Sequence, residues 1–191
     1  MNIQNTIEAS IKTKQLILKD QTLLKRIQDA ADAVVNCYRN DGKVLLCGNG
    51  GSAADAQHIA AEFTGRFYYD RPPLFAEALH VNTSYITAVA NDYGYDEVYA
   101  RYVAAAGRKD DIFIGLSTSG NSPNILKAME EAKSRGVITI ALTGESGGKM
   151  KPLADLLLNM PSKDTPRIQE SHILVGHIIC ELVEKTIFPK G

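Results

Sequence analysis

Two short polar loops stand out because their residue types could hold a phosphate group. Gly48-Asn-Gly-Gly-Ser52 follows an apolar run and precedes a helical pattern. Its small residues would let the backbone approach a ligand closely, and the free N–H groups at a helix N-terminus attract anions. A second loop, Leu116-Ser-Thr-Ser-Gly-Asn-Ser122, lies in the same position after another apolar run. It offers four hydroxyl groups, which belong to Ser117, Thr118, Ser119 and Ser122.

The hydroxyl-rich loop is the stronger of the two signals. Ser122 followed by Pro123 is typical of a helix start, with Ser at the N-cap and Pro at the first helical position. A cap needs only one hydroxyl, whereas this loop carries four and a glycine. Hydroxyls and helix N–H groups together can bind a phosphate monoester without a lysine. We therefore expect a phosphate site at residues 117–122.

The glycine-rich loop alone leaves a second interpretation open. With Ala53 it matches the loose pattern G-x-G-x-x-A, which would indicate a nicotinamide-dependent dehydrogenase. Such enzymes place an acidic residue at the end of the second strand, where it binds a ribose. Here the second apolar run leads into His80-Val-Asn-Thr83, which contains no carboxylate. The sequence therefore favours the phosphate site over a dinucleotide site.

Two helical patterns carry residues suited to acid–base chemistry or metal binding. His58 and Glu62 are four residues apart, which places them on one face of a helix that we expect near the C-terminal edge of the sheet. The last helical pattern carries Gln169, Glu170, His172 and His177 among apolar neighbours. A surface His–Glu pair and a structural core histidine would look the same. Neither helix identifies a site by itself.

The order of apolar runs indicates an α/β protein. Strands are predicted at 43–47, 74–81, 111–116, 137–142 and 155–159, and helices at 52–64, 84–90, 96–106, 122–135 and 166–186. The runs are continuously apolar, as in a parallel sheet covered on both faces. We expect a three-layer αβα sandwich with a five-stranded parallel sheet. Its ligands should bind at the C-terminal ends of the strands.

Residues 1–40 predict two further helices before the α/β unit, within one domain spanning 1–191. Apolar residues recur at helical spacing from Ile3 to Ile11 and from Leu23 to Tyr38, and Asp20 suits the N-cap of the second helix. Both apolar faces need a partner. Leading helices of this kind often find it in another subunit, so we expect this helical pair to serve oligomerisation.

The composition excludes several classes of protein. A net charge of −1 provides no field that would attract nucleic acid or an anionic membrane. No apolar run is long enough to span a bilayer, and the N-terminus lacks the features of a signal peptide. The three cysteines, Cys37, Cys47 and Cys180, lie in apolar runs, which indicates buried thiols in a reducing compartment. We expect a cytoplasmic protein that binds neither nucleic acid nor membranes.

Taken in combination, these motifs resemble a known family. The two loops, the turn Leu142-Thr-Gly-Glu-Ser-Gly-Gly148 and the helix Arg167-Ile-Gln-Glu…His177 are similar to the sugar isomerase (SIS) domain. Within it, the whole chain resembles the phosphoheptose isomerases. The resemblance implies conversion of sedoheptulose 7-phosphate into D-glycero-D-manno-heptose 7-phosphate, the first step toward heptose precursors of surface glycans such as lipopolysaccharide or capsule. It also implies a homotetramer whose active sites are completed by neighbouring subunits.

The resemblance further implies roles for individual residues. Glu62 and His177 would be the catalytic pair. The zinc ligands, for one ion per subunit, would be His58, Glu62, Gln169 and His177. The sugar would contact Asn49, Gly50, Gly51, Glu62, Asn91, Asp92 and Gln169. The phosphate would be held by Ser117, Thr118, Ser119 and Ser122.

The implied chemistry needs such residues. Aldose–ketose interconversion moves a proton between C1 and C2 through an enediol, while a second proton moves between the two oxygens. Glu62 could perform the carbon step if burial raises its pKa, and His177 could serve the oxygens. Zinc accepts imidazole nitrogen and carboxylate or amide oxygen. A ligated Glu62 or His177 is less free as a base or acid, so the role of the metal stays open.

A regulator without catalytic activity is the alternative interpretation. One bacterial SIS-domain relative binds the replication initiator protein, and three segments of this chain resemble it: 88–92, 96–100 and 186–189. That relative has non-catalytic residues where this chain has Glu62 and His177. The presence of both residues favours the enzyme, although sequence alone does not establish the length of the sugar.

Overall fold

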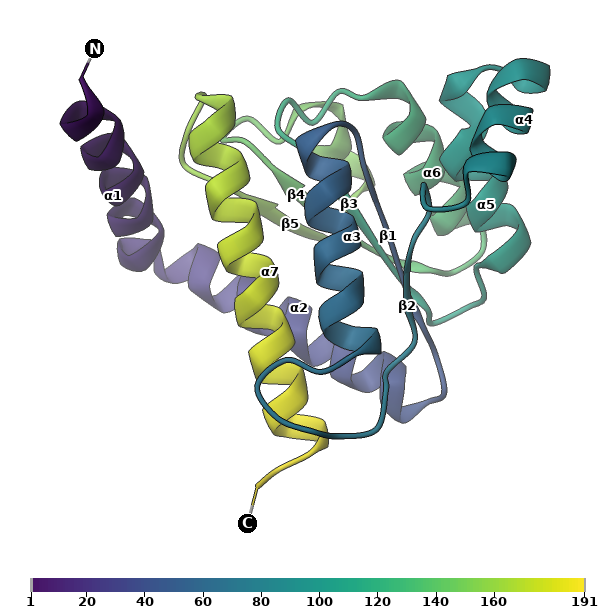
Figure 1. Cartoon of the computed structure of the whole chain (residues 1–191), viewed down its shortest axis with the longest axis horizontal. Helices are drawn as coiled ribbons and strands as arrows, with labels where there is room; N and C mark the ends of the chain where they lie inside the picture. Colours follow the sequence, from purple (N-terminus) through teal and green to yellow (C-terminus); the bar gives the residue numbers. More distant parts are fainter. Residues whose placement is uncertain (1, 191) are drawn as a thin grey trace.

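The computed structural model describes residues 2–190 and contains a parallel sheet between two layers of helices (Figure 1). The sheet has five strands in the order β2-β1-β3-β4-β5. Their bounds are β1 Val44–Gly48, β2 Ala76–Ala78, β3 Ile112–Ser117, β4 Ile138–Thr143 and β5 Leu156–Asn159. The predicted fold class is confirmed.

Side chains that alternate along the strands explain why both faces of the sheet are covered. In β1, Val44 and Leu46 face one apolar cluster while Leu45 and Cys47 face another. The first cluster is closed by α2 (Gln21–Arg39), α3 (Gly51–Thr64) and α7 (Thr165–Ile187). The second is closed by α4 (Thr83–Tyr93), α5 (Val98–Ala106) and α6 (Pro123–Ser134). Continuous burial on both faces accounts for the unbroken apolar runs.

Helices α3 and α7 lie side by side and run in the same direction (Figure 1). A Cβ atom at Gly176 of α7 would lie 2.4 Å from Cδ1 of Ile59, so the two helices approach closely at this point. About two turns closer to the N-terminal ends of both helices, the side-chain amide of Gln169 on α7 lies against Gly51 on α3. Equivalent heights on the two helices are therefore about 118 residues apart in sequence, which brings residues near 58 beside residues near 177.

The first helix, α1 (Ile3–Lys19), reaches away from the sheet (Figure 1). Most of its apolar side chains are exposed. Ile7 is 55% exposed and Ile11 is 49% exposed. The Ser10 hydroxyl donates to a carboxylate oxygen of Glu170 over 2.7 Å, which ties α1 to α7. The predicted cap between the first two helices is confirmed, because Asp20 Oδ1 accepts from the Leu23 N–H over 3.0 Å.

Some predicted bounds were wrong for identifiable reasons. The strand expected at 74–81 is reduced to Ala76–Ala78, because it lies at the edge beside β1 alone and follows Pro72-Pro73. The helix expected at 96–106 begins as a 3-10 turn, η1 (Tyr95–Glu97), before α5. A further 3-10 helix, η2 (Gly148–Leu153), was not predicted because it contains Pro152 and follows a glycine.

The expectation that the three cysteines are buried is confirmed. Cys37, Cys47 and Cys180 are all buried free thiols, as expected. Between residues 2 and 190, none of the helices combines the length and apolar character that crossing a bilayer requires.

Candidate active site

The two polar loops meet at the C-terminal edge of the sheet. Strands β1 and β3 are neighbours, with Gly48 opposite Leu116 at their ends, so the loops that follow start side by side. In the order β2-β1-β3-β4-β5 the chain turns in opposite directions from β1 and β3. Ligands of such sheets bind in the crevice between these two strand ends. The topology therefore supports a single binding site for both loops.

The hydroxyl groups of the serine loop (residues 117–122) converge. Ser117 Oγ lies 2.9 Å from Ser122 Oγ and 3.4 Å from Ser119 Oγ. Ser122 occupies the N-cap position of α6 as predicted, but among the described residues its hydroxyl makes no capping bond to the helix. The predicted N-cap position is therefore confirmed, while the Ser122 hydroxyl bonds to that of Ser117. These hydroxyl groups lie at the start of α6 and bond to one another, and that of Ser122 does not bond to the helix backbone.

Gly120 of the serine loop packs closely against the turn that leads into η2. Gly120 has a φ of +66°, and a Cβ atom there would lie 2.3 Å from the carbonyl oxygen of Gly147. The Met150 N–H donates to the Gly120 carbonyl oxygen over 3.0 Å, so the loop is anchored on η2. Any larger residue at position 120 would be strained and would push the two turns apart.

A cleft of about 240 Å³ opens beside the serine loop. Its lining includes Thr118, Ser119, Glu145 and Lys163. Lys163 lies 3.1 Å from a carboxylate oxygen of Glu145 and is largely exposed. Sequence reasoning missed this lysine, which lines the same cleft as the serine loop.

The remaining sugar-contact candidates surround the same edge. Asn49 forms a reciprocal amide pair with Asn124 of α6, with 2.9 Å between the bonded atoms in both directions. Gly50 and Gly51 open α3 beside it. Asn91 and Asp92 lie exposed at the end of α4, where the Asn91 amide donates to Asp92 Oδ1 over 2.9 Å.

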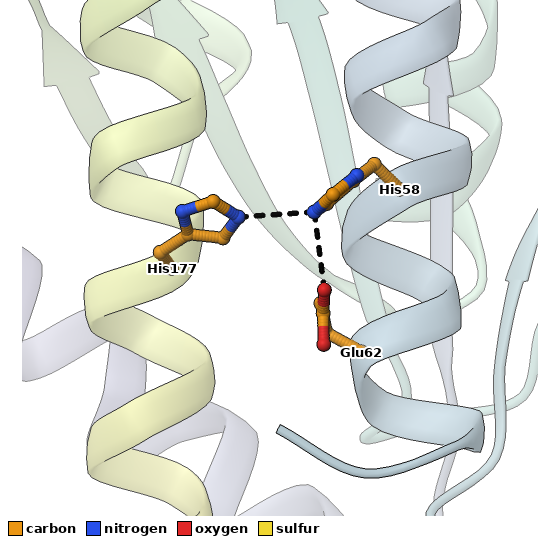
Figure 2. A group of neighbouring side chains, drawn as sticks. All are labelled: His58, Glu62 and His177. Atoms are coloured by element: carbon orange, nitrogen blue, oxygen red, sulfur yellow. Dashed lines mark hydrogen bonds and ion pairs between the residues drawn. The ribbon is translucent and has the colours of Figure 1, made fainter. Parts of the chain in front are cut away.

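A separate group of polar side chains lies between α3 and α7. Figure 2 shows His58 and Glu62 from α3 and His177 from α7 pointing toward one another. His58 Nε2 is 3.1 Å from Glu62 Oε1 and 3.1 Å from His177 Nε2. The Glu62 side chain is 24% exposed and that of His58 is 52% exposed. This triad of His58, Glu62 and His177 includes both predicted catalytic residues.

The donor set of the triad fits a metal ion. One ligand atom from each residue lies within 4.8 Å of the others. Ligands at zinc–nitrogen and zinc–oxygen distances of about 2.1 Å in a tetrahedron are about 3.4 Å apart, close to the spacings found here. Two imidazoles and one carboxylate leave a fourth position open, as in catalytic zinc sites. These residues could therefore hold zinc.

The fourth predicted zinc ligand is not part of this group. Gln169 lies eight residues before His177 on α7, which corresponds to about 12 Å along the helix axis. Its side-chain amide lies against Gly51, within about one turn of the start of α3. The structure thus brings together three of the four predicted ligands and leaves Gln169 beside the glycine loop.

The height of the triad also differs from expectation. The His58–Glu62 pair was expected near the C-terminal edge of the sheet. Helix α3 starts at that edge and runs back along the sheet, so His58 lies about 10 Å below Gly51. The cleft beside the serine loop contains none of the triad residues. Within one chain, the cleft beside the serine loop and the triad are therefore two separate surfaces.

Known proteins are similar to this chain over nearly its full length. The model of the SIS domain matches residues 10–144. The chain is 55% identical to the phosphoheptose isomerase of Aneurinibacillus thermoaerophilus, covering 97% of this chain and 94% of the relative. It is 56% identical to phosphoheptose isomerase 2 of Campylobacter jejuni, covering 95% and 90%. The chain belongs to the phosphoheptose isomerase family.

A solved structure agrees with this assignment. A phosphoheptose isomerase from Francisella tularensis superposes with a TM-score of 0.92 at 42% identity, over 96% of both chains. The chain is accordingly an isomerase. These relatives lend no support to the alternative of a non-catalytic regulator.

In this member of the family, a buried ion pair holds a loop against the triad. Arg71 and Glu184 are 3.1 Å apart and only 2% and 1% exposed. Glu184 accepts the backbone N–H groups of Phe67 and Tyr68 over 2.9 and 2.8 Å, and the Phe67 ring lies 5.6 Å from that of His177. Arg71 also donates to the Glu62 carbonyl oxygen over 2.8 Å. Sequence reasoning missed these residues, because their partners lie more than a hundred positions away.

His172 on α7 has a structural role, as its apolar neighbours suggested. It is fully buried, and its Nε2 lies 3.1 Å from the Thr143 carbonyl oxygen at the end of β4. Burial lowers the pKa of His172 to about 4. The ring is therefore neutral at physiological pH and donates to Thr143, which fixes α7 beside the turn at 144–148.

Proposed function

We propose that this chain interconverts sedoheptulose 7-phosphate and D-glycero-D-manno-heptose 7-phosphate. The observation that carries the proposal is the triad, in which Glu62 and His177 lie beside His58 on a chain more than half identical to phosphoheptose isomerases. The sugar phosphate would span two surfaces. The serine loop would hold its phosphate, and the triad would face its first two carbons.

Phosphate binding supplies position rather than chemistry. The converging hydroxyls of Ser117, Ser119 and Ser122 would donate to the phosphate oxygens at the start of α6. Thr118 would add a further hydroxyl from the wall of the cleft. Asn49, Gly50, Gly51, Asn91, Asp92 and Gln169 would meet the sugar hydroxyls along the same edge. Fixing the phosphate in this way would present C1 and C2 to the acid–base pair.

The triad supplies the proton transfers. Glu62 would take the proton from C1 of the ketose and return it to C2, which passes through an enediol. His177 would donate a proton to the C2 oxygen and recover one from the C1 hydroxyl. The Phe67 ring against His177 and the Arg71 bond to the Glu62 backbone would keep both groups in place.

We further propose one zinc ion per subunit, held by His58, Glu62 and His177. When bound, zinc would polarise a sugar oxygen as a Lewis acid, and the His177 imidazole, then a ligand, would no longer donate a proton to that oxygen. Gln169 remains a proposed fourth ligand, but its amide must move away from Gly51 to reach the ion. Its present position suits contact with the sugar.

We infer a homotetramer in which one subunit's triad faces another subunit's serine loop. Two observations support this inference. The cleft beside the serine loop lacks the triad residues, and α1 exposes an apolar stripe that includes Ile3, Ile7 and Ile11. A tetramer would cover the stripe and complete the sites. We place the enzyme in the cytoplasm, at the first step toward heptose precursors for lipopolysaccharide or capsule.

Turnover by matched variants tests the proposal. The purified protein should convert sedoheptulose 7-phosphate, while Glu62→Gln and His177→Gln should each lose at least about a thousandfold in kcat. His80→Gln changes a histidine outside the triad and should retain activity. Product formation that survives both triad substitutions would exclude the assigned acid–base pair. An inactive wild-type protein, with zinc supplied, would exclude the proposed reaction.

A further inference from the structure

We propose that Asn124 and Tyr95 set the orientation of the Asn49 side chain, so that Asn49 offers the sugar phosphate one N–H donor and no acceptor. Asn124 is thus a positioning residue that acts through Asn49. The inference rests on the proposed function, because it concerns how the same site recognises its substrate.

The contacts form a short chain across the crevice between β1 and β3. Asn49 Nδ2 donates to Asn124 Oδ1 and Asn124 Nδ2 donates to Asn49 Oδ1, each over 2.9 Å. The Tyr95 hydroxyl donates to Asn49 Oδ1 over 3.3 Å. Asn124 is 1% exposed, whereas Tyr95 is 50% exposed. The pair joins the glycine loop to the first turn of α6, directly after the serine loop.

The backbone N–H of Ile125 determines the positions of the oxygen and the nitrogen in the side-chain amides of Asn124 and Asn49. The Ile125 N–H can only donate, and it donates to Asn124 Oδ1 over 3.0 Å. Asn124 must therefore turn its Nδ2 toward Asn49, and Asn49 must meet it with Oδ1. The same geometry places Asn49 Nδ2 opposite Asn124 Oδ1. The orientation follows from hydrogen-bond chemistry rather than from the similar shapes of the two amide ends.

A count of hydrogen-bond donors and acceptors shows which group of the Asn49 side chain is left to bind a ligand. A side-chain amide has two N–H donors and an oxygen with two lone pairs. Asn124 and Tyr95 use both lone pairs of Asn49 Oδ1, and Asn124 uses one N–H of Asn49. One N–H of Asn49 is left for a ligand. Its partner must be an acceptor, such as a hydroxyl, carbonyl or phosphate oxygen of the sugar phosphate.

A double-mutant cycle on binding tests this role. Sedoheptulose 7-phosphate is titrated calorimetrically into the full-length protein and its variants. Asn49→Ala and Asn124→Ala should each weaken binding about tenfold, which corresponds to one lost hydrogen bond to the ligand. In the Asn49→Ala background, Asn124→Ala should cost less than twofold, because its effect passes through Asn49. A general disturbance of the loops would persist in that background.

A second pair of variants covers the case in which Asn124→Ala does not fold. Tyr95→Phe removes one exposed hydroxyl and should weaken binding about threefold, again only while Asn49 is present. Tyr38→Phe removes a hydroxyl that donates to the Phe75 carbonyl oxygen, and should leave affinity unchanged. Additive losses in either cycle overturn the inference, as does a wild-type protein that fails to bind the sugar phosphate. A protein that binds it and shows the coupling, but does not isomerise it, overturns only the proposed function.

Discussion

The Nε2 atoms of His58 and His177 lie 3.1 Å apart, although 119 residues separate them in the sequence. A hydrogen bond between two neutral imidazoles requires one ring to donate and the other to accept. A metal ion would instead take a lone pair from both rings. Each ring would then carry its proton on Nδ1, away from the ion.

Zinc affinity should therefore depend on both histidines. We expect His58→Gln and His177→Gln each to weaken zinc binding by about a hundredfold or more, because each removes one of three ligands. Competition with a chromophoric chelator measures the change. His80→Gln serves as the matched control and should bind zinc like the wild type. Equal affinity in the wild type and His177→Gln would contradict the proposed site.

The serine loop should be sensitive to one added methyl group. Gly120→Ala would force a left-handed residue and place Cβ against the Gly147 carbonyl. We expect KM for sedoheptulose 7-phosphate to rise about tenfold or more, as measured by steady-state kinetics.

Gly136→Ala provides the matched control for backbone strain. Gly136 also has a positive φ, of +71°, but lies beside Lys109 at the opposite edge of the sheet. Its substitution should lower the Tm without changing KM. A similar rise in KM for both variants would show that strain, rather than the phosphate loop, determines binding.

Most of the fold could be predicted from the sequence, because continuous apolar runs and helical spacing are local signals. The strands of the centre, β1, β3 and β4, lie within one or two residues of their predicted bounds. The edge strand β2 was overestimated, since pairing on one side alone does not extend it. The helix η2 was missed because Pro152 and the preceding glycine argue against a helix, whereas the hydrogen bond from Met150 to Gly120 that anchors it joins two distant segments.

The site was predictable in its residue types but not in its spatial grouping. The i, i+4 spacing of His58 and Glu62 places them on one face, yet only the close packing of α3 on α7 brings His177 to them. Gln169 was grouped with them by resemblance and lies elsewhere on α7. Asn124 carried a weak signal, an amide directly after Ser122-Pro123 at a helix start. Arg71 and Glu184 carried no signal, because nothing in the sequence shows that folding of the loop at 67–71 against α7 pairs these two charged residues.

Stability should fall in mild acid because of His172. Its pKa is lowered by burial to about 4 in the folded protein, compared with 6.5 for the unperturbed group. The unfolded chain therefore binds a proton first as pH falls. About 3 kcal/mol of stability, present in full above pH 6.5, should be lost progressively as pH falls to 4.

The His172→Gln variant isolates this contribution. It keeps an N–H donor for the Thr143 carbonyl but cannot gain a proton. Urea unfolding between pH 7 and pH 4 should show a shallower loss of stability than in the wild type. Parallel curves for the two proteins would assign the acid sensitivity to other groups.

The buried Arg71–Glu184 pair should make a large contribution to stability. Burial alone would raise the pKa of Glu184, but the N–H groups of Phe67 and Tyr68 and the Arg71 guanidinium outweigh it and hold that pKa below its usual value. Glu184→Gln should destabilise the protein by about 3 kcal/mol, because it leaves Arg71 without its counter-charge. Differential scanning calorimetry at pH 7 should show a Tm lower by about 6–12 °C.

The pH dependence of this effect has a definite direction. A carboxyl with a depressed pKa stabilises the folded state above its unfolded pKa and loses that contribution as pH falls through its folded value. The gap between wild type and Glu184→Gln should therefore narrow below about pH 4. Glu181→Gln breaks an exposed pair with Lys185 on the same helix and should change the Tm little. A comparable loss in both variants would refute the role of the buried pair.

The distance between the triad and the serine loop along α3 has a genetic consequence. If each reaction centre combines one subunit's triad with another's phosphate loop, two alleles defective in different halves can complement each other. At a substrate concentration well below the raised KM of Gly120→Ala, a mixture of the Glu62→Gln and Gly120→Ala proteins should turn over faster than the two proteins kept apart, once their subunits are allowed to exchange. Some hybrid interfaces would then unite an intact Glu62 with an intact Gly120. Restored activity in such hybrids would reveal the shared architecture without any image of the assembled enzyme.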